Sequence, residues 1–338
     1  NKMKKLKVFI ICLTISFILQ IGVLYYFDKV LFKESENITI ENVETSVKDD
    51  ITKIHIPSNA KDIQPSYSGR YVSYFLDGRL MLVNTKTLET KEILEDTNIL
   101  NIKWVPNNNT LFVVENSSNK VSVKTYNVKN DVEQEVCELS PYKAKMKVES
   151  FISTSAEYVS ISDNNETVTY RINIDKEIRQ VDKVINGLES ADAFWSKDVL
   201  IYQDAVNKSI YRYNNGKSKE LKFNNLSNII ILRTVNNKVY LGQYTMEQGS
   251  KKITKVIFGE DESDTSIWET KVLEEPVNIK DIYITEKNEI VVNNSILHEV
   301  NNIMTGERIT YEGEFIAINE RVLISLDDNN MLNLKNIK

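Results

Sequence analysis

The sequence predicts an all-β fold built from repeated four-stranded units, and three observations support this. From Ile51 onward, short segments alternate apolar and polar residues with a period of two, as strands with one buried face do. Clusters of Asn, Asp, Gly and Ser separate these segments. The strands recur in groups of four, about every 41 residues. After residue 51 no long stretch has the apolar period of an amphipathic helix.

The clearest unit spans residues 62–94. Its second and third strands meet at Asp77-Gly78, a strong signal for a two-residue hairpin turn. Asn214 to Gly216 gives a similar turn signal in a later unit. The other complete units are expected at 100–139, 148–184, 191–223, 229–273 and 279–311.

The two ends of the repeat region complement each other. Only three strands follow Phe315, and one unassigned strand precedes the first unit, at Ile51 to Ile56. Together they make a full four-stranded unit, which would close the array into a ring without exposed sheet edges. The prediction is a seven-bladed β-propeller closed by its N-terminal strand; six blades is the alternative if the two least regular units are wrongly divided.

Three segments resemble a known blade motif. Gln64 to Tyr74, Trp104 to Asn108 and Phe194 to Asp198 look like degenerate copies of W-S-P-D-G-x-x-I-A, the motif of TolB-like and dipeptidyl-peptidase-IV-like (WD40-like) propellers. This resemblance covers most of residues 51–338 and implies the fold more than any activity. The sequence departs from the propeller peptidases by lacking the nucleophile elbow G-x-S-x-G of a hydrolase domain. TolB-like proteins have an α/β domain before the propeller, where this chain has a short polar segment.

The N-terminal segment predicts a membrane anchor. Val8 to Phe27 reads VFIICLTISFILQIGVLYYF without a charge, and about 20 residues at 1.5 Å each span the roughly 30 Å hydrocarbon layer. Four lysines precede this run, which favours a cytoplasmic N-terminus. We expect a cytoplasmic basic segment at 1–7, a single-pass transmembrane helix at 8–27, a stalk at 28–50 and an extracytoplasmic propeller at 51–338.

Two alternatives to a retained anchor remain open. A cleaved secretory signal requires a shorter apolar core and a small-x-small site, whereas this core continues into Tyr25-Tyr26-Phe27. A lipoprotein modified at Cys12 is disfavoured by the bulky Ile11 before it. Met3 is the expected start of translation.

Charge and cysteine content exclude several partners. The chain carries −6, and because residues 1–27 contribute four lysines and no acid, the remainder carries −10. Such an acidic ectodomain disfavours binding to nucleic acid or to an anionic membrane surface. Cys12 and Cys137 are expected in different compartments, so no intrachain disulfide is predicted. The many Asn, Lys and Ile residues are typical of low-GC bacterial coding.

Residues that could carry catalysis are few. His55 and His298 are interpreted as strand histidines, and Cys137 as a buried or edge thiol on an outer strand. The loop from Glu260 to Asp264 lacks calcium-loop spacing and is interpreted as a solvated acidic loop, with a calcium site as the alternative. Asp327-Asp328 is interpreted as a turn. We therefore predict no catalytic residue, no cofactor and no metal site.

The three tryptophans are interpreted as structural. Trp104 and Trp195 are placed at the same position, the end of the inner strand, where they would pack between blades. Trp268 is placed on an outer strand with fewer constraints. The predicted function is a membrane-tethered, extracytoplasmic module that binds an envelope protein, a peptide or a wall polymer. The alternative is a glycan-degrading enzyme with paired carboxylates in the central channel.

Overall fold

The computed structural model describes residues 19–20, 51–106, 108–164, 166–181, 185–223, 226–319 and 321–337. The predicted basic segment, transmembrane helix and stalk lie outside these residues, except for Leu19 and Gln20, which are helical. In the described part of the chain, no helix has the length and apolar character needed to cross a membrane.

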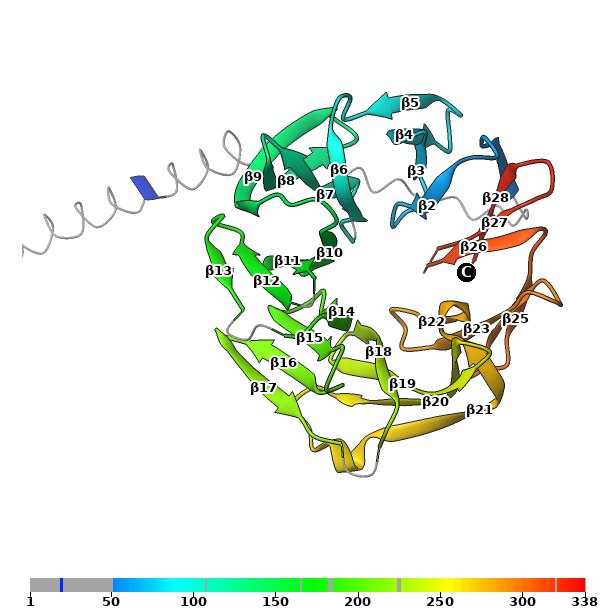
Figure 1. Cartoon of the computed structure of the whole chain (residues 1–338). Coiled ribbons are helices and arrows are strands. Elements are labelled where there is room, and N and C mark those ends of the chain that lie inside the picture. The colour runs from blue at the N-terminus through cyan, green and yellow to red at the C-terminus, as the bar shows by residue number, and fades with distance from the viewer. Residues whose placement is uncertain are drawn as a thin grey trace, which may run out of the picture. The chain divides into compact units, whose positions relative to one another are not determined.

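Seven four-stranded antiparallel sheets form a ring of blades, so the chain is a seven-bladed β-propeller (Figure 1). The prediction of seven blades is confirmed. Blades 1 to 4 consist of β2 (Lys61–Pro65), β3 (Tyr71–Leu76), β4 (Arg79–Asn84) and β5 (Thr90–Ile93); β6 (Asn98–Trp104), β7 (Thr110–Ser117), β8 (Lys120–Asn127) and β9 (Val132–Pro141); β10 (Lys147–Ile152), β11 (Ala156–Asp163), β12 (Glu166–Asn173) and β13 (Ile178–Gln180); β14 (Leu188–Ala193), β15 (Val199–Asp204), β16 (Ile210–Asn214) and β17 (Lys217–Leu221).

Blades 5 and 6 differ most in strand length. Blade 5 has the long strands β19 and β20 with a long outer strand β21, whereas the strands of blade 6 are short. Two 3₁₀ turns, η3 and η4, flank β21. The elements are β18 (Ile229–Val235), β19 (Lys238–Glu247), β20 (Ser250–Glu260), η3 (Thr265–Ile267) and β21 (Glu269–Asn278); η4 (Ile279–Asp281), β22 (Ile282–Ile284), β23 (Ile290–Asn294), β24 (Glu299–Asn302) and β25 (Arg308–Thr310).

Blade 7 joins the two ends of the propeller. It contains β26 (Glu314–Ile318), β27 (Val322–Leu326), β28 (Met331–Asn336) and, as its outermost strand, β1 (Ile51–His55). β1 and β28 are antiparallel, with a register that runs from Ile51 opposite Lys335 to His55 opposite Met331. Closure by the N-terminal strand is therefore confirmed.

The predicted hairpin turns form because their residues tolerate positive φ. Asp77 and Gly78 have φ of 51° and 83° and join β3 directly to β4. Asn215 and Gly216, at 50° and 78°, join β16 to β17 in the same way. Positive φ at both central residues matches the right-handed twist of the paired strands.

The hydrophobic core is divided among the spaces between blades. Each neighbouring pair of blades encloses one cluster of buried side chains, and there are seven such clusters in the described residues. The cluster between blades 6 and 7 is the smallest, with Val291, Val300, Tyr311 and Leu323 as its buried members. The contact between blades 6 and 7 therefore buries the fewest apolar side chains of the seven.

The alternating strand directions give the ring two distinct faces. The top face is defined here as the one that carries the links from each outermost strand to the next innermost strand, together with the turns between second and third strands. The bottom face carries the remaining turns. Because β1 is an outermost strand that leads into β2, residue 51 lies at the bottom face, and β28 also ends there.

Candidate binding groove

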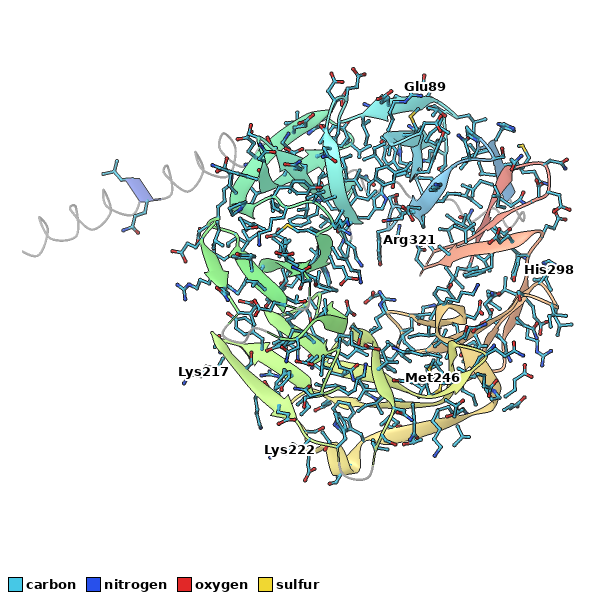
Figure 2. The ribbon with its side chains drawn as sticks, in the orientation of Figure 1. Glu89, Lys217, Lys222, Met246, His298 and Arg321 are labelled. Atoms are coloured by element: carbon cyan, nitrogen blue, oxygen red, sulfur yellow. The ribbon has the colours of Figure 1, made fainter. Side chains whose placement is uncertain are left out.

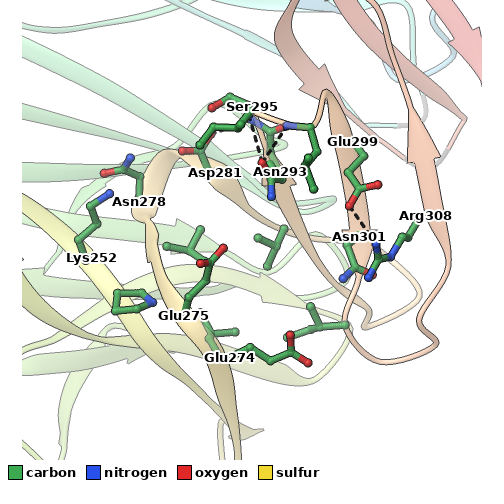
Figure 3. Close-up of a pocket in the computed structure, with 18 of the residues that line it drawn as sticks. Lys252, Glu274, Glu275, Asn278, Asp281, Asn293, Ser295, Glu299, Asn301 and Arg308 are labelled. Carbon is green, nitrogen blue, oxygen red and sulfur yellow. Dashed lines mark hydrogen bonds and ion pairs between the residues drawn. The ribbon is translucent and has the colours of Figure 1, made fainter.

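A groove of about 530 Å³ lies between the outer parts of blades 5 and 6 (Figure 3). Eight consecutive residues of β21, 271–278, form one wall, and β23, β24 and the turn between them form the other. The volume is within the range of about 300–1,000 Å³ that is typical of ligand sites. None of the residues that line this groove is aromatic.

A bulge in β21 opens the groove. Ile253 and Lys255 of β20 pair with Val277 and Val272, so the segment 273–276 between these partners has no counterpart on β20. The segment includes Pro276, which has no backbone N–H to donate to a ladder. Leu273 is buried between blades 5 and 6, and the neighbouring glutamates are exposed. The short strands of blade 6 leave this side of β21 uncovered.

Exposed aliphatic side chains stand along the groove. Val272 is 62% exposed, Ile296 88% and Leu297 59%. The turn between β23 and β24 fixes the latter two, because Asn294 Oδ1 accepts hydrogen bonds from the backbone N–H groups of Ile296 and Leu297, both at 3.1 Å. This Asx-type turn presents two large apolar side chains to solvent in a defined position.

A chain of hydrogen bonds connects the groove to a second hollow. The Tyr311 hydroxyl donates to Asn293 Oδ1 at 2.7 Å, and Asn293 Nδ2 donates to Asp281 Oδ1 at 2.9 Å. Burial raises the pKa of Tyr311, so the hydroxyl stays protonated and acts as a donor. The second hollow has about 580 Å³ and lies between blades 6 and 7 on the top face. Asp281 and Asn293 line both spaces.

The two spaces carry more negative than positive side chains. The charged residues that line them are Glu274, Glu275, Asp281, Glu299, Glu314, Asp328, Lys252, Lys271, Lys280 and Arg308. Glu299 and Arg308 pair with each other at 3.3 Å (Figure 3). Glu274 and Glu275 form no ion pair with any residue that the structure describes. Asn301 Oδ1 is buried in the groove wall and has no hydrogen-bond partner in the described part of the chain.

The histidines do not form a common site. His55 lies on the closing strand β1, as predicted, and its side chain is exposed. His298 lies in the turn before β24 with φ of 50°, so its placement within a strand is wrong. Its Nδ1 is 2.8 Å from the Gly313 carbonyl oxygen, and Figure 2 shows the residue at the outer rim of the ring. The aliphatic residues Ile296 and Leu297 suggest a strand, but both are exposed and belong to the turn at 295–298.

Cys137 is a half-buried thiol on the outer strand β9, as predicted. Burial, with a smaller contribution from Glu157, raises the pKa of the Cys137 thiol to about 11. Glu157 itself is half-buried on β11, and burial raises its pKa to about 7. The thiol is therefore protonated near neutral pH, which disfavours a nucleophilic role.

The tryptophan predictions are confirmed only in part. The Trp104 indole N–H donates to Ser73 Oγ at 3.1 Å and to the Gln64 carbonyl at 3.3 Å, both in blade 1, so inter-blade packing is confirmed. Trp195 packs against the cluster between blades 2 and 3. However, its position is not equivalent to that of Trp104: Trp104 pairs with Leu111, and the matching pair in blade 4 is Ala193 with Leu200.

Trp268 is not on an outer strand, which corrects the prediction. It follows η3 and is buried, with its indole N–H donating to Ser263 Oγ at 3.0 Å. Its ring packs edge-on against Phe223 and covers Gly259, where any Cβ would collide with the indole. This burial could not be predicted from local sequence, because the ring fills space left by Gly259 on the strand β20.

The acidic loop at 260–264 is only partly solvated. Asp261 is 3% exposed and pairs with Lys197 at 2.5 Å and Arg212 at 2.6 Å, both from blade 4. Two cations compensate for the loss of water around this carboxylate. Asp264 instead caps η3 by accepting from the Ser266 N–H. The turn at Asp327-Asp328 is confirmed between β27 and β28.

Three carboxylates on the innermost strands have partners within the protein. Asp192 accepts hydrogen bonds from the Thr234 N–H at 2.7 Å and hydroxyl at 3.1 Å. Glu149 pairs with Lys147 at 3.0 Å, and Glu189 pairs with lysines of blades 4 and 5. Figure 2 shows Arg321 beside the central opening of the ring. Within the described residues, no group of three or more His, Cys, Asp or Glu side chains is placed to hold a metal ion.

Several solved structures share this architecture, and the proteins they show differ in their named activities. An oligogalacturonate lyase in complex with manganese is 11% identical over 86% of this chain and 92% of that one, with a TM-score of 0.58. The chain shares the β-propeller fold. A prolyl endopeptidase is 13% identical over 75% of this chain and 42% of that one, with a TM-score of 0.54. Hsv2 from Kluyveromyces marxianus is 11% identical over 82% and 92%, with a TM-score of 0.51.

TolB from Acinetobacter baumannii is also similar, at 14% identity over 80% of this chain and 65% of that one, with a TM-score of 0.47. No protein-family model and no curated protein matches the sequence. At these identities the similarity establishes the propeller fold and leaves function to the local chemistry of the chain. Enzymes and proteins not named as enzymes both occur among the neighbours with a TM-score above 0.5.

The groove residues were not identified from the sequence. Two signals were available: Pro276 within an otherwise β-like segment, and Ile296-Leu297 directly after an Asn-Asn-Ser turn. Each signal alone is common in loops and strands. Their proximity depends on how blades 5 and 6 pack, which no local pattern encodes.

Proposed function

We propose that this protein is a membrane-tethered, extracytoplasmic β-propeller that binds a protein, a peptide or a wall polymer through the groove between blades 5 and 6. The observation that carries the proposal is the set of exposed aliphatic side chains at Val272, Ile296 and Leu297 beside a groove of about 530 Å³. Exposed apolar side chains along a groove are typical of interaction sites.

The tether in this proposal is the uncharged segment from Val8 to Phe27, with the N-terminus in the cytoplasm. The support for this topology is the sequence of residues 1–50. Protease added to intact spheroplasts should digest the propeller and spare a short N-terminal fragment. A fully protected chain would contradict an extracytoplasmic location.

The binding role is tested by purification of the tagged full-length chain from its native membranes in mild detergent, followed by mass spectrometry. The groove variant carries Ile296→Asp and Leu297→Asp, two changes at exposed positions. The matched control is Ile174→Asp, at a 74% exposed aliphatic residue in a turn of blade 3.

The expected result is a stoichiometric partner that copurifies with the wild type and the control and is lost from the groove variant. Recovery of the chain alone would contradict the binding role. Retention of the partner by the groove variant would exclude the groove as the binding site.

A further inference from the structure

The groove has a charge pattern along its long wall that restricts what it can bind. Glu274 and Glu275 lie in the middle of this wall, within the bulge of β21. Lys271 lies towards one end, and Lys252 lies at the other, where it pairs with Asn278 across the sheet. Figure 3 shows Glu275 and Glu274 on this wall, with Lys252 and Asn278 at one end of it. The carboxylates at the centre therefore favour a positively charged group in the middle of a bound ligand.

The apolar side chains favour a polypeptide over a sugar polymer. The groove offers the aliphatic residues Val272, Ile296 and Leu297, which suit aliphatic side chains of a ligand. It offers no aromatic face among the residues that line it.

The length of the wall sets the size of the ligand. Lys271 and Asn278, at the two ends of this wall, pair with Val256 and Lys252, which are four residues apart on β20, so at about 3.3 Å per residue the wall is roughly 13 Å long. An extended segment of about five residues spans that distance. A folded domain would not enter a groove of about 530 Å³, but a single extended strand fits.

We infer that the occupant is an extended segment of a partner protein, in which a central Lys or Arg is flanked by aliphatic residues. This inference rests on the proposed binding role of the same groove. The basic side chain pairs with Glu274 and Glu275, and its aliphatic neighbours pack on Ile296 and Leu297. The acidic composition of the propeller adds a longer-range attraction for such a segment.

The test uses the purified full-length chain in mild detergent and a phage library of random twelve-residue peptides. Peptides selected on the wild type are synthesised with a fluorescent label, and their affinity is measured by anisotropy. We expect enrichment of sequences with a central Lys or Arg between aliphatic residues. Replacing Glu274 and Glu275 by Gln should weaken binding by about tenfold and reduce its salt dependence.

The matched control removes an acidic pair elsewhere. Glu95→Gln with Asp96→Asn neutralises two exposed carboxylates in the loop after β5, remote in the ring from blade 6. Affinity of the control should stay within about twofold of the wild type. Equal loss in both double variants would show that only overall charge matters, which would overturn the inference.

Other outcomes separate this inference from the proposed function. Selection of acidic or uncharged peptides, or peptides that bind the Ile296→Asp, Leu297→Asp variant equally well, overturns the inference. Groove-dependent binding of solubilised wall fragments without any peptide enrichment also overturns it, while leaving the binding role intact. If native membranes yield a groove-dependent partner but no peptide binds, the partner uses a folded surface and the inference alone fails.

Discussion

Glu157 gives the propeller a measurable pH dependence. Its side chain lies on the face of β11 that meets blade 2, and its strand neighbours are Ile152 and Ile172. Burial raises the pKa of this carboxyl from 4.5 to about 7, partly opposed by a hydrogen bond from its own backbone N–H. A raised pKa means that the folded state holds the proton more tightly than the unfolded state does. The stabilisation is therefore complete below pH 4.5 and is lost as the pH rises through about 7.

The size of the effect follows from the pKa change. A rise from 4.5 to about 7 corresponds to about 3 kcal/mol of unfolding free energy between the protonated and ionised limits. Glu157→Gln removes this titration and leaves a side chain of similar shape. Relative to the wild type, the variant should gain about 3 kcal/mol in unfolding free energy between pH 4.5 and pH 8.

The assay is urea denaturation followed by tryptophan fluorescence at both pH values. The difference in unfolding free energy between variant and wild type is taken at pH 4.5 and at pH 8. Comparing these two differences cancels the contribution of all other titrating groups. Glu166→Gln, at an exposed carboxylate of the same blade, is the matched control and should show no such change. If the Glu157→Gln variant and the wild type differ by the same free energy at pH 4.5 and pH 8, the argument from burial is refuted.

Three further predictions concern stability and reactivity. Trp104→Phe removes the indole donor to Ser73 and Gln64 and should lower the unfolding free energy in urea by about 1–3 kcal/mol; an unchanged midpoint would contradict an inter-blade hydrogen bond. Gly313→Ala should cost at least about 2 kcal/mol, because its φ is +80° and a Cβ would collide with the backbone of β27. Gly216→Ala, at φ of +78° in open space, is its control and should cost only about 1 kcal/mol; equal losses would refute the collision. At pH 8, iodoacetamide should modify Cys137 about 100-fold more slowly in the folded chain than in urea, because burial raises the pKa of the thiol to about 11; equal rates would contradict this.

The repeat pattern was accessible from the sequence because blades are local structures. Each hairpin joins neighbours in the chain, and turns such as Asp77-Gly78 specify their own geometry. The closing strand was also predictable, since three strands at one end and one at the other complete a blade. The pairing is favoured because it leaves no sheet edge with unpaired backbone groups at the junction of the two chain ends.

Features that depend on contacts between blades were predicted less well. Trp195 was expected at the position equivalent to Trp104, but Ala193, two residues earlier, holds that position. The register within a blade is set by the bulges and turns around each strand. Asp261 was expected in solvent, but cations from the preceding blade make its burial tolerable. The binding groove arises from a bulge in β21 and from the short strands of blade 6 together, and neither is informative alone.

The closing strand also determines the order in which the ring can fold. β1 is the first strand of the propeller, but its partner β28 is the last, so Ile51 and Lys335 must meet across nearly the whole chain. Loop closure over such a separation is slow compared with hairpin formation. During synthesis, blades 1 to 6 can form as the chain emerges, while β1 stays unpaired until β28 has been made. Pairing of β28 with β1 is therefore the last step that closes the ring. A chain that ends before Met331 would leave β1 and β27 each with an unpaired edge, open to association with other chains.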